Sequence, residues 1–471
     1  MSGLRIVRMA NFVTPSSGGL RTALQELGSG YLAAGHEPVL IVPGPSASDE
    51  QTVQGRVITV PGPVLPGTGG YRVLTARRAV RRVLEDLAPD RLEVSDRTTL
   101  RWTGEWARRH RVRSVMVSHE TADGVLRTWG VPGAAAGRAA DRINLRSAWA
   151  YSKIVCTTEW AEREFLRIGV RNVLRAPLGV DLERCRPERR SERLRARYLR
   201  CFDGDSGDDG VLLLLGSRLS VEKRPGTALD ALAALRARGV RATLVVAGEG
   251  PLRAGLVRRA RAQRLPALFL GHVADRQSMA DLQAAADVCL APGPAETFGL
   301  SALEALACGT PVVASRSSAL PEVIGDAGIA AADNGAAFAD AVGELLARDP
   351  ADRREAARAR AGLFGWDAAV RAFLAAHEAP AAHPATPAQP VAVAAAPVFR
   401  AAGAAGAPDP AQPFAGPDTP GGPTEQGPTA HGAGPARPRP AVTGQDTPDP
   451  APSGPAPSGP SAATGQEGAP A

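Results

Sequence analysis

The sequence predicts an α/β protein with two parallel sheets, followed by a segment without a fold of its own. Short apolar strands alternate with amphipathic helices over most of the chain, a strongly charged stretch at 183–209 divides that part in two, and the composition changes abruptly near residue 379. Such alternation is typical of parallel sheets covered by helices. The 471 residues are enough for two domains with sizeable cores.

The expected strands define two domains, 1–182 and 183–378. In the first domain we expect strands near 4–9, 39–42, 92–94, 115–117 and 154–157. In the second we expect them near 211–215, 242–247, 268–270, 288–290 and 311–314, and a closing helix near 366–376 that packs back on the first domain. Ligands of open α/β sheets bind beyond the carboxyl ends of the strands, so we expect those ends to face each other across one deep cleft.

The remaining segment, 379–471, is rich in Ala, Pro and Gly, and more than half of the 41 prolines of the chain lie in it. Such a composition cannot bury enough apolar surface to offset its ordering entropy, so we expect a disordered tail.

Charge and composition narrow the class of partner. The net charge of +7 and the pI of 9.6 favour an anionic ligand or surface. Aromatic residues make up only 4% and no zinc-finger spacing is present, which argues against nucleic acid. No apolar run approaches the length of a membrane span, the first ten residues resemble a strand rather than a signal peptide, and the five cysteines lack paired spacing. A cytoplasmic protein with reduced thiols is expected.

The strongest functional signal is the segment Glu296-Thr-Phe-Gly-Leu-Ser-Ala-Leu-Glu304, directly after an expected strand. A helix beginning near Phe298 would place Glu296 in the loop and Glu304 about two turns along. The free backbone N–H groups of 298–301 would form an anion site, and the carboxylates would accept hydrogen bonds from vicinal hydroxyls. The alternative is two solvated acids at the start of a helix.

A second signal, Gly216-Ser-Arg218-Leu-Ser-Val-Glu-Lys223, follows the first strand of the second domain. Arginine offers a planar fork and lysine a point charge, so the pair could neutralise a diphosphate leaving group without a metal. Only two of the 55 basic residues are lysines, Lys153 and Lys223, which favours a specific role for Lys223 over plain surface charge.

Weaker signals end other expected strands. Gly18 and Gly19 would permit close approach of a phosphate or a sugar, and His119 could bond a sugar hydroxyl. Gly248, within Ala-Gly-Glu-Gly-Pro, and His272 with Val273 could frame a nucleoside, although tight turns would explain them equally well.

These motifs together resemble glycosyltransferase family 4, whose GT-B fold has two facing Rossmann-like domains, and the resemblance covers most of residues 4–376. It implies a catalytic set made of His119, Glu296, Arg218 and Lys223. It implies a donor-binding set made of Gly18, Gly19, Arg218, Lys223, Gly248, His272, Val273, Glu296, Phe298, Gly299, Leu300 and Glu304. In that family Glu304 would hold the ribose, Glu296 the transferred sugar, and Arg218 with Lys223 the diphosphate.

Four further runs, at 18–23, 92–97, 117–120 and 291–299, look like actinobacterial GDP-mannose-dependent mannosyltransferases of the phosphatidylinositol mannoside pathway. This resemblance implies transfer of α-mannose from GDP-mannose to a phosphatidylinositol mannoside, with retention of configuration and no metal or other cofactor. It also implies a peripheral protein on the inner face of the cell membrane.

A lipid acceptor requires a surface that meets the membrane. The segment 71–87 offers an apolar stripe beside basic residues, and a second basic cluster follows at 108–113. The alternative is a core-packed helix with a solvated charged face. The stripe comprises Val73, Val80, Val83, Leu84 and Leu87, and its basic residues are Arg77, Arg78, Arg81 and Arg82.

Other functions remain open from the sequence. The chain could be a family 4 transferase with a UDP-sugar donor and a soluble or cell-wall acceptor, a nucleotide-sugar epimerase, or a non-catalytic scaffold that binds nucleotide sugars. The complete set of acidic and basic motif residues argues against the scaffold. The sequence does not predict the linkage position, the oligomeric state or the role of the tail.

Overall fold

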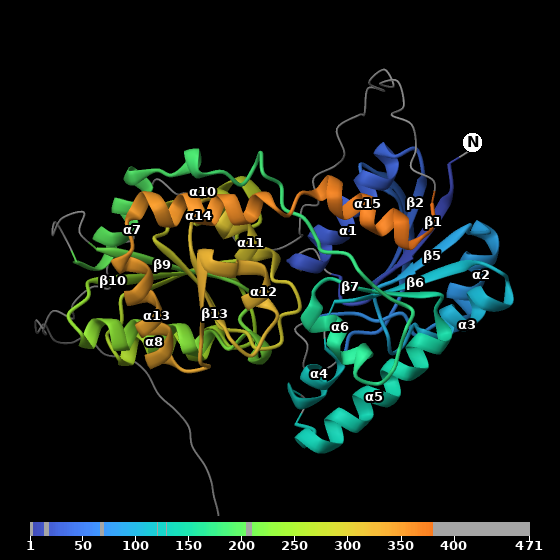
Figure 1. The fold of residues 1–471 in the computed structure, drawn as a ribbon, viewed down its shortest axis with the longest axis horizontal. Coiled ribbons are helices and arrows are strands. Elements are labelled where there is room, and N and C mark those ends of the chain that lie inside the picture. Colours follow the sequence, from blue (N-terminus) through green and yellow to red (C-terminus); the bar gives the residue numbers. More distant parts are fainter. Residues whose placement is uncertain are drawn as a thin grey trace, which may run out of the picture. The chain divides into compact units, whose positions relative to one another are not determined.

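A computed structural model describes residues 3–13, 18–65, 70–119, 121–128, 130–203 and 210–379. These residues form two β-sheets with helices on both sides of each (Figure 1). The predicted tail lies outside the described residues except for Ala379, and so do Glu120 and 14–17 of the glycine-containing loop.

The first sheet has eight strands in the order β3-β4-β2-β1-β5-β6-β7-β8, all parallel except for the antiparallel pair β3 and β4. Its strands are β1 (Arg5–Met9), β2 (Glu37–Gly44), β3 (Ser48–Thr52), β4 (Gly55–Pro61), β5 (Arg91–Val94), β6 (Arg113–Ser118), β7 (Lys153–Cys156) and β8 (Val173–Arg175). Its helices are α1 (Gly19–Ala33), α2 (Arg77–Leu87), α3 (Arg101–Arg109), α4 (Ala122–Thr128), α5 (Gly133–Ala150) and α6 (Glu159–Leu166).

The second sheet has six parallel strands in the order β11-β10-β9-β12-β13-β14. They are β9 (Val211–Gly216), β10 (Ala242–Ala247), β11 (Ala267–Gly271), β12 (Val288–Ala291), β13 (Val312–Ser315) and β14 (Gly328–Ala331). The helices are α7 (Glu192–Asp203), α8 (Pro225–Ala237), α9 (Arg253–Ala262), α10 (Arg276–Ala285), α11 (Leu300–Ala307), α12 (Leu320–Ile324), α13 (Gly335–Ala347), α14 (Pro350–Gly362) and α15 (Trp366–Ala376). Three 3₁₀ turns are η1 (Pro187–Arg189), η2 (Val221–Lys223) and η3 (Gly325–Ala327).

Successive side chains of β1 point to opposite faces of the first sheet, and both faces are buried. Ile6 packs in a cluster with Leu27 of α1 and Phe373 of α15, whereas Val7, on the opposite face, packs with Leu84 of α2. The apolar residues of β1 are therefore all inside. The ten strands expected from the sequence are present, and the sequence analysis missed β3, β4, β8 and β14.

The last helix, α15, packs against α1 of the first sheet. A Cβ atom on Gly30 would lie 2.2 Å from Val370, so the two helices are in close contact there. The residue after the helix, His377, bonds through Nε2 to Glu93 on β5 over 3.0 Å and packs edge-on to Tyr31 of α1. The C-terminal end of the described chain thus contributes to the core of the first sheet.

Glu93 is the centre of a buried polar group. One carboxylate oxygen accepts from Arg8 Nε over 2.8 Å, and the other accepts from the Tyr31 hydroxyl over 2.7 Å. Burial alone would raise the pKa of Glu93, but the charges of Arg8 and His377 and their hydrogen bonds outweigh it and lower the pKa well below its usual range. The carboxylate is therefore charged and paired in the folded chain.

Both sheets reverse their strand order at one point. In the first, the chain moves outward from β1 through β2 and then returns to β5 on the other side of β1. In the second, it moves outward from β9 through β10 and returns to β12 beside β9. Loops that leave neighbouring strands in opposite directions open a crevice at such a point, where ligands of α/β sheets bind. The predicted site residues follow β1, β6, β9 and β12, except for Gly248 after β10 and His272 with Val273 after β11.

Candidate functional site

The loop after β12 contacts the carboxyl ends of β6 and β7 through Thr297. The carbonyl oxygen of Thr297 accepts hydrogen bonds from the hydroxyls of Thr158 (2.8 Å) and Thr157 (3.3 Å), and its own hydroxyl donates to the carbonyl of His119. Thr297 is only 4% exposed, so these bonds are shielded from water. The carboxyl ends of strands from both sheets therefore meet at this residue.

Lys223 and Glu296 form an ion pair within the second sheet's site. Lys223 ends η2 in the loop after β9, and Glu296 lies in the loop after β12, so the switch point brings them together. A Cβ atom on Gly293 would lie 3.3 Å from the Cα of Lys223, which shows how closely the two loops approach. Both side chains are partly exposed, so a bound ligand could reach them.

Arg218 lies over the ring of Tyr71, with 4.4 Å between the guanidinium carbon and the ring centroid. Tyr71 belongs to the segment before α2 and itself packs edge-on to Phe12 after β1. A guanidinium over an aromatic face keeps its N–H groups directed sideways, toward other acceptors. The cation predicted to bind a diphosphate is thus oriented by a side chain from the first sheet's domain.

The N-terminus of α1 lies beside the N-terminus of α11. A Cβ atom on Gly19 would be 3.6 Å from Cδ1 of Leu300, the first residue of α11. Among the described residues, no side chain caps either helix, and neither has an acidic residue in its first turn. The uncapped first turns of two helices therefore lie next to each other, and the N–H groups and dipole of a helix start favour an anionic ligand.

The start of α11 differs from the prediction. The helix begins at Leu300 rather than near Phe298, because Gly299 adopts φ 77°, a left-handed conformation outside the helix. A Cβ at Gly299 would also lie 2.3 Å from Cδ2 of Leu320, so a larger residue would have to displace that side chain as well as adopt a strained backbone. The side chain of Phe298 is buried and packs edge-on to Phe364. Phe298 is thus a core residue that can offer a ligand only its backbone.

His119 follows β6 and bonds through Nε2 to the hydroxyl of Ser95, which follows β5, over 3.0 Å. Burial lowers the pKa of His119 to about 4, with Arg8 and Arg97 adding to this shift and Glu93 opposing it. The imidazole is therefore neutral at physiological pH. It can exchange hydrogen bonds with hydroxyl groups but does not supply a positive charge.

Glu304 lies one turn into α11, not two, and its surroundings differ from those of Glu296. Burial raises the pKa of Glu304, and the nearby Arg276 partly opposes this effect. Arg276 also donates to Glu26 (2.9 Å) and Thr22 (2.8 Å), both on α1. The carboxyl of Glu304 thus lies in a shielded place close to a second contact between the domains.

Three of the weaker predictions concern residues after β10 and β11. A Cβ at Gly248 would lie 1.8 Å from the carbonyl oxygen of Ser217, so glycine is needed where β10 ends beside the Arg218 loop. His272 is exposed, and Val273 is half-buried against the core. None of these contacts tests their predicted place beside the nucleoside.

The structure therefore places seven predicted residues around the two switch points, and these are Gly19, His119, Arg218, Lys223, Glu296, Gly299 and Leu300. The sequence analysis missed Thr297, Ser95, Tyr71 and Arg276 as parts of this region. Thr297 and Ser95 lie inside two of the motifs, at positions to which the sequence pattern assigns no role. Tyr71 lies in the segment that the sequence predicts to face a membrane, and nothing near Arg276 distinguishes it from the other arginines.

Two family descriptions match the chain, "Glycosyl transferase 4-like domain" over residues 18–179 and "Glycosyl transferases group 1" over residues 210–348. A protein of Mycobacterium tuberculosis (strain ATCC 25177 / H37Ra) is 49% identical over 377 residues, which are 79% of this chain and 95% of the relative. The chain belongs to glycosyltransferase family 4. That relative is named GDP-mannose-dependent alpha-(1-6)-phosphatidylinositol dimannoside mannosyltransferase.

This glycosyltransferase is similar over a shorter length to D-inositol 3-phosphate glycosyltransferase 2 of Catenulispora acidiphila, at 37% identity over 41% of the chain and 47% of the relative. Sucrose-phosphate synthase from Thermosynechococcus elongatus has the same fold, with a TM-score of 0.63 at 21% identity over 80% of this chain and 98% of that one. The predicted GT-B fold, with two parallel-sheet domains, is confirmed.

Two further observations bear on membranes and metals. Within the described ranges, no helix has both the length and the apolar character needed to cross a bilayer. In the same ranges, no group of three or more His, Cys, Asp and Glu side chains is arranged to hold a metal ion.

Proposed function

We propose that this glycosyltransferase moves α-mannose from GDP-mannose to a phosphatidylinositol mannoside lipid. The observation that carries the choice of donor and acceptor is the 49% identity to the mycobacterial mannosyltransferase, which extends over 95% of that protein. The α-(1-6) linkage in the relative's name is the linkage to test first.

The geometry supports a diphosphate at the meeting point of the two sheets. Lys223 and Arg218 supply cations, and the uncapped starts of α1 and α11 supply N–H groups. An anion bound there would be stabilised by fixed donors in a partly buried place, where electrostatic interactions are stronger than in water. This agrees with the roles that the family resemblance implies for Arg218 and Lys223.

In the proposed reaction, the bond between the anomeric carbon and the diphosphate oxygen breaks while the acceptor hydroxyl forms a bond on the same face. The hydroxyl proton passes to the departing diphosphate oxygen, and GDP leaves. The configuration is thereby retained without a protein nucleophile. Arg218 and Lys223 would stabilise the leaving charge, and Glu296 would position the mannose through its hydroxyls. No metal ion is required in this scheme.

His119 would lie on the side of the transferred sugar. Its neutral imidazole is held by Ser95, and its own carbonyl is held by Thr297. A neutral ring can exchange hydrogen bonds with a sugar hydroxyl without adding a positive charge near the anomeric carbon, where positive charge develops in the transition state.

The test is transfer of labelled mannose from GDP-mannose to phosphatidylinositol mannosides in vesicles, with UDP-glucose and UDP-N-acetylglucosamine as parallel donors. Label in the lipid from GDP-mannose alone would support donor and acceptor together, and linkage analysis of the product would follow. Label from a UDP-sugar would overturn the donor. Inositol 3-phosphate serves as a soluble acceptor in a parallel arm, because one group of relatives carries that acceptor in its name.

A lipid acceptor also implies that the enzyme works as a peripheral protein at the inner face of the membrane. The net charge of +7 supports attraction to an anionic surface.

A further inference from the structure

The outward face of α5 carries a stripe of basic and apolar side chains. The buried residues of this helix include Ala136, Ala140, Asn144 and Ser147, which lie on one side. On the opposite side, at helical spacing, five exposed residues follow one another. They are Arg138, Arg142, Leu145, Arg146 and Trp149.

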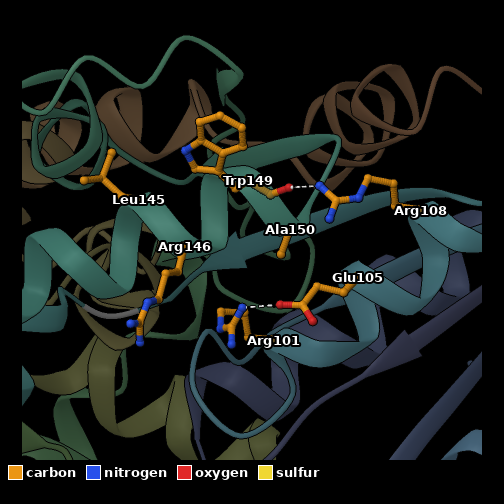
Figure 2. A pocket seen from close by; sticks show the side chains of 7 residues that line it. All are labelled: Arg101, Glu105, Arg108, Leu145, Arg146, Trp149 and Ala150. Atoms are coloured by element: carbon orange, nitrogen blue, oxygen red, sulfur yellow. Dashed lines mark hydrogen bonds and ion pairs between the residues drawn. The ribbon is translucent and has the colours of Figure 1, made fainter.

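The apolar members of the stripe are exposed to an unusual degree. Trp149 is 76% exposed and Leu145 is 38% exposed, although both are large apolar side chains. Figure 2 shows both projecting from α5 at the rim of a cavity of about 260 Å³ that α5 shares with α3. Single exposed apolar residues need no explanation, but two on adjacent turns, next to arginines, form a patch.

The basic members of the stripe lack internal partners. Arg138, Arg142 and Arg146 form no ion pair or hydrogen bond with any residue in the described part of the chain. The nearest acid on α5, Asp141, is already paired with Arg167. Their charges are therefore available to an external anion.

Helix α3 extends the positive surface across the cavity. Arg108 donates to the backbone carbonyl of Trp149 over 2.8 Å, and Arg101 pairs with Glu105 (Figure 2). The contact from Arg108 fixes the C-terminal end of α5, where Trp149 lies. With Arg146, the cavity is lined by three arginines and one glutamate.

Helix α2 belongs to the segment that the sequence predicts to face a membrane, but its apolar side chains do not form an exposed stripe. Val80, Leu84 and Leu87 are buried in the core of the first sheet, and Val83 packs against the same core. The exposed side of α2 therefore has arginines but none of the stripe's large apolar residues, and Glu85 and Asp86 are exposed beside them.

We infer that the stripe of α5, together with Arg108 of α3, is the surface by which the protein docks on an anionic phospholipid bilayer. The choice of a lipid surface as the partner rests on the proposed function. Tryptophan prefers the interface between headgroups and acyl chains, and arginine forks pair with lipid phosphates. An interfacial surface with a basic side, exposed aromatic and aliphatic side chains, and no unpaired acid matches that chemistry.

The experiment is flotation of the full-length protein with vesicles of phosphatidylcholine, with and without phosphatidylinositol. The wild type should float with the anionic vesicles and not with the neutral ones. The double variant Arg142→Gln/Arg146→Gln should lose affinity by about fivefold per arginine, and Trp149→Ala should also weaken binding. The matched control is Arg77→Gln/Arg78→Gln on α2, which removes the same charge from the same domain.

Equal flotation of the α5 variants and the wild type would overturn the inference, as would a larger loss in the α2 control. All substituted side chains are exposed, so thermal unfolding should be unchanged and a folding defect would be seen there. If Trp149→Ala instead changed the molecular mass measured by light scattering and left flotation intact, the stripe would be a contact between two copies of the chain.

Membrane docking through α5 and mannosyl transfer can be tested independently of each other. Transfer to acceptor dispersed in detergent should be the same for wild type and α5 variants, because the stripe contains none of the predicted site residues. A protein that floats through α5 but transfers no mannose would retain the surface and refute the proposed function.

Discussion

The ammonium group of Lys223 and the carboxylate of Glu296 form an ion pair between the loops after β9 and β12. These residues have different predicted tasks, since one would bind the donor diphosphate and the other the hydroxyls of the transferred sugar. Their contact brings the two residues with these predicted tasks together at one place. It also means that neither charge is unpaired when the donor is absent.

We predict that Lys223→Ala lowers kcat for mannosyl transfer by about two to three powers of ten, because a fixed charge is lost where the leaving diphosphate develops its own. Steady-state kinetics with GDP-mannose measure the change. The matched control is Arg238→Ala, which breaks an exposed ion pair with Asp340 (2.7 Å) in the same domain and should leave kcat unchanged. Turnover close to that of the wild type in Lys223→Ala would refute the assignment.

The contact between the two residues predicts that their effects are not additive. Each single alanine variant breaks the same ion pair, so part of each loss comes from that shared contact. The double variant Lys223→Ala/Glu296→Ala should therefore be less impaired than the product of the two single effects. A double-mutant cycle in kcat/KM measures this coupling, and strictly multiplicative losses would show that the two side chains act independently.

The stacking of Arg218 on Tyr71 predicts a role for an aromatic ring outside the motifs. Tyr71→Ala should lower kcat/KM by about 2- to 30-fold, the range expected when a cation–π contact is lost. Tyr71→Phe keeps the ring and should remain close to the wild type. If both variants were equally impaired, the hydroxyl rather than the ring would be responsible.

The lowered pKa of His119 predicts the pH dependence of the site. With a pKa of about 4 the imidazole stays neutral between pH 5 and 8. The kcat/KM profiles of wild type and His119→Asn should thus have the same shape over this range, although the variant is slower. A titration of the His119 ring protons near pH 6.5, observed by NMR, would contradict this. Stability should fall as the pH drops below about 6.5, because only the unfolded chain then binds this proton.

The buried carboxylate of Glu93 predicts a stability effect far from the site. Glu93→Gln removes a charge paired with Arg8 and should destabilise the first domain by about 3–5 kcal/mol at pH 7. Because the folded pKa is lowered, this contribution is present above about pH 4.3 and is lost as the pH falls below it. Urea unfolding of wild type and Glu93→Gln at pH 7 and again below about pH 4.3 measures how the difference in free energy of unfolding changes with pH. The control is Glu37→Gln, which removes a carboxylate from an exposed pair with Arg5.

The strands were predictable because both faces of a parallel strand are buried, which leaves runs such as Val-Leu-Leu-Leu-Leu at 211–215. Two of the four strands that were missed, β3 and β14, lack this signal. β3 consists of Ser-Asp-Glu-Gln-Thr with little burial, and β14 is only the four residues Gly-Ile-Ala-Ala. Neither has enough apolar surface to distinguish it from a loop.

The site was predictable where a motif sits at a strand end, as for Lys223 and Glu296. It was not predictable where the partner comes from a distant part of the chain. Tyr71 beside Arg218 and the hydroxyls of Thr157 and Thr158 beside Thr297 meet only through the packing of two domains. The predicted start of α11, near Phe298, is two residues before the observed start. The cause is local, because Gly299 has a left-handed conformation and the helix begins only after it.

The bond between His377 and Glu93 has a consequence for synthesis on the ribosome. The first sheet is complete in sequence by β8, but its core also needs α15 and His377, about 200 residues later. At typical translation rates of 5–20 residues per second, roughly 10–40 seconds pass before that part emerges. During this interval Glu93 lacks one of its partners and the apolar face of α1 lacks its cover. The nascent first domain should therefore be a client for chaperones, and a chain stalled before residue 366 should be more sensitive to proteases than one stalled in the tail.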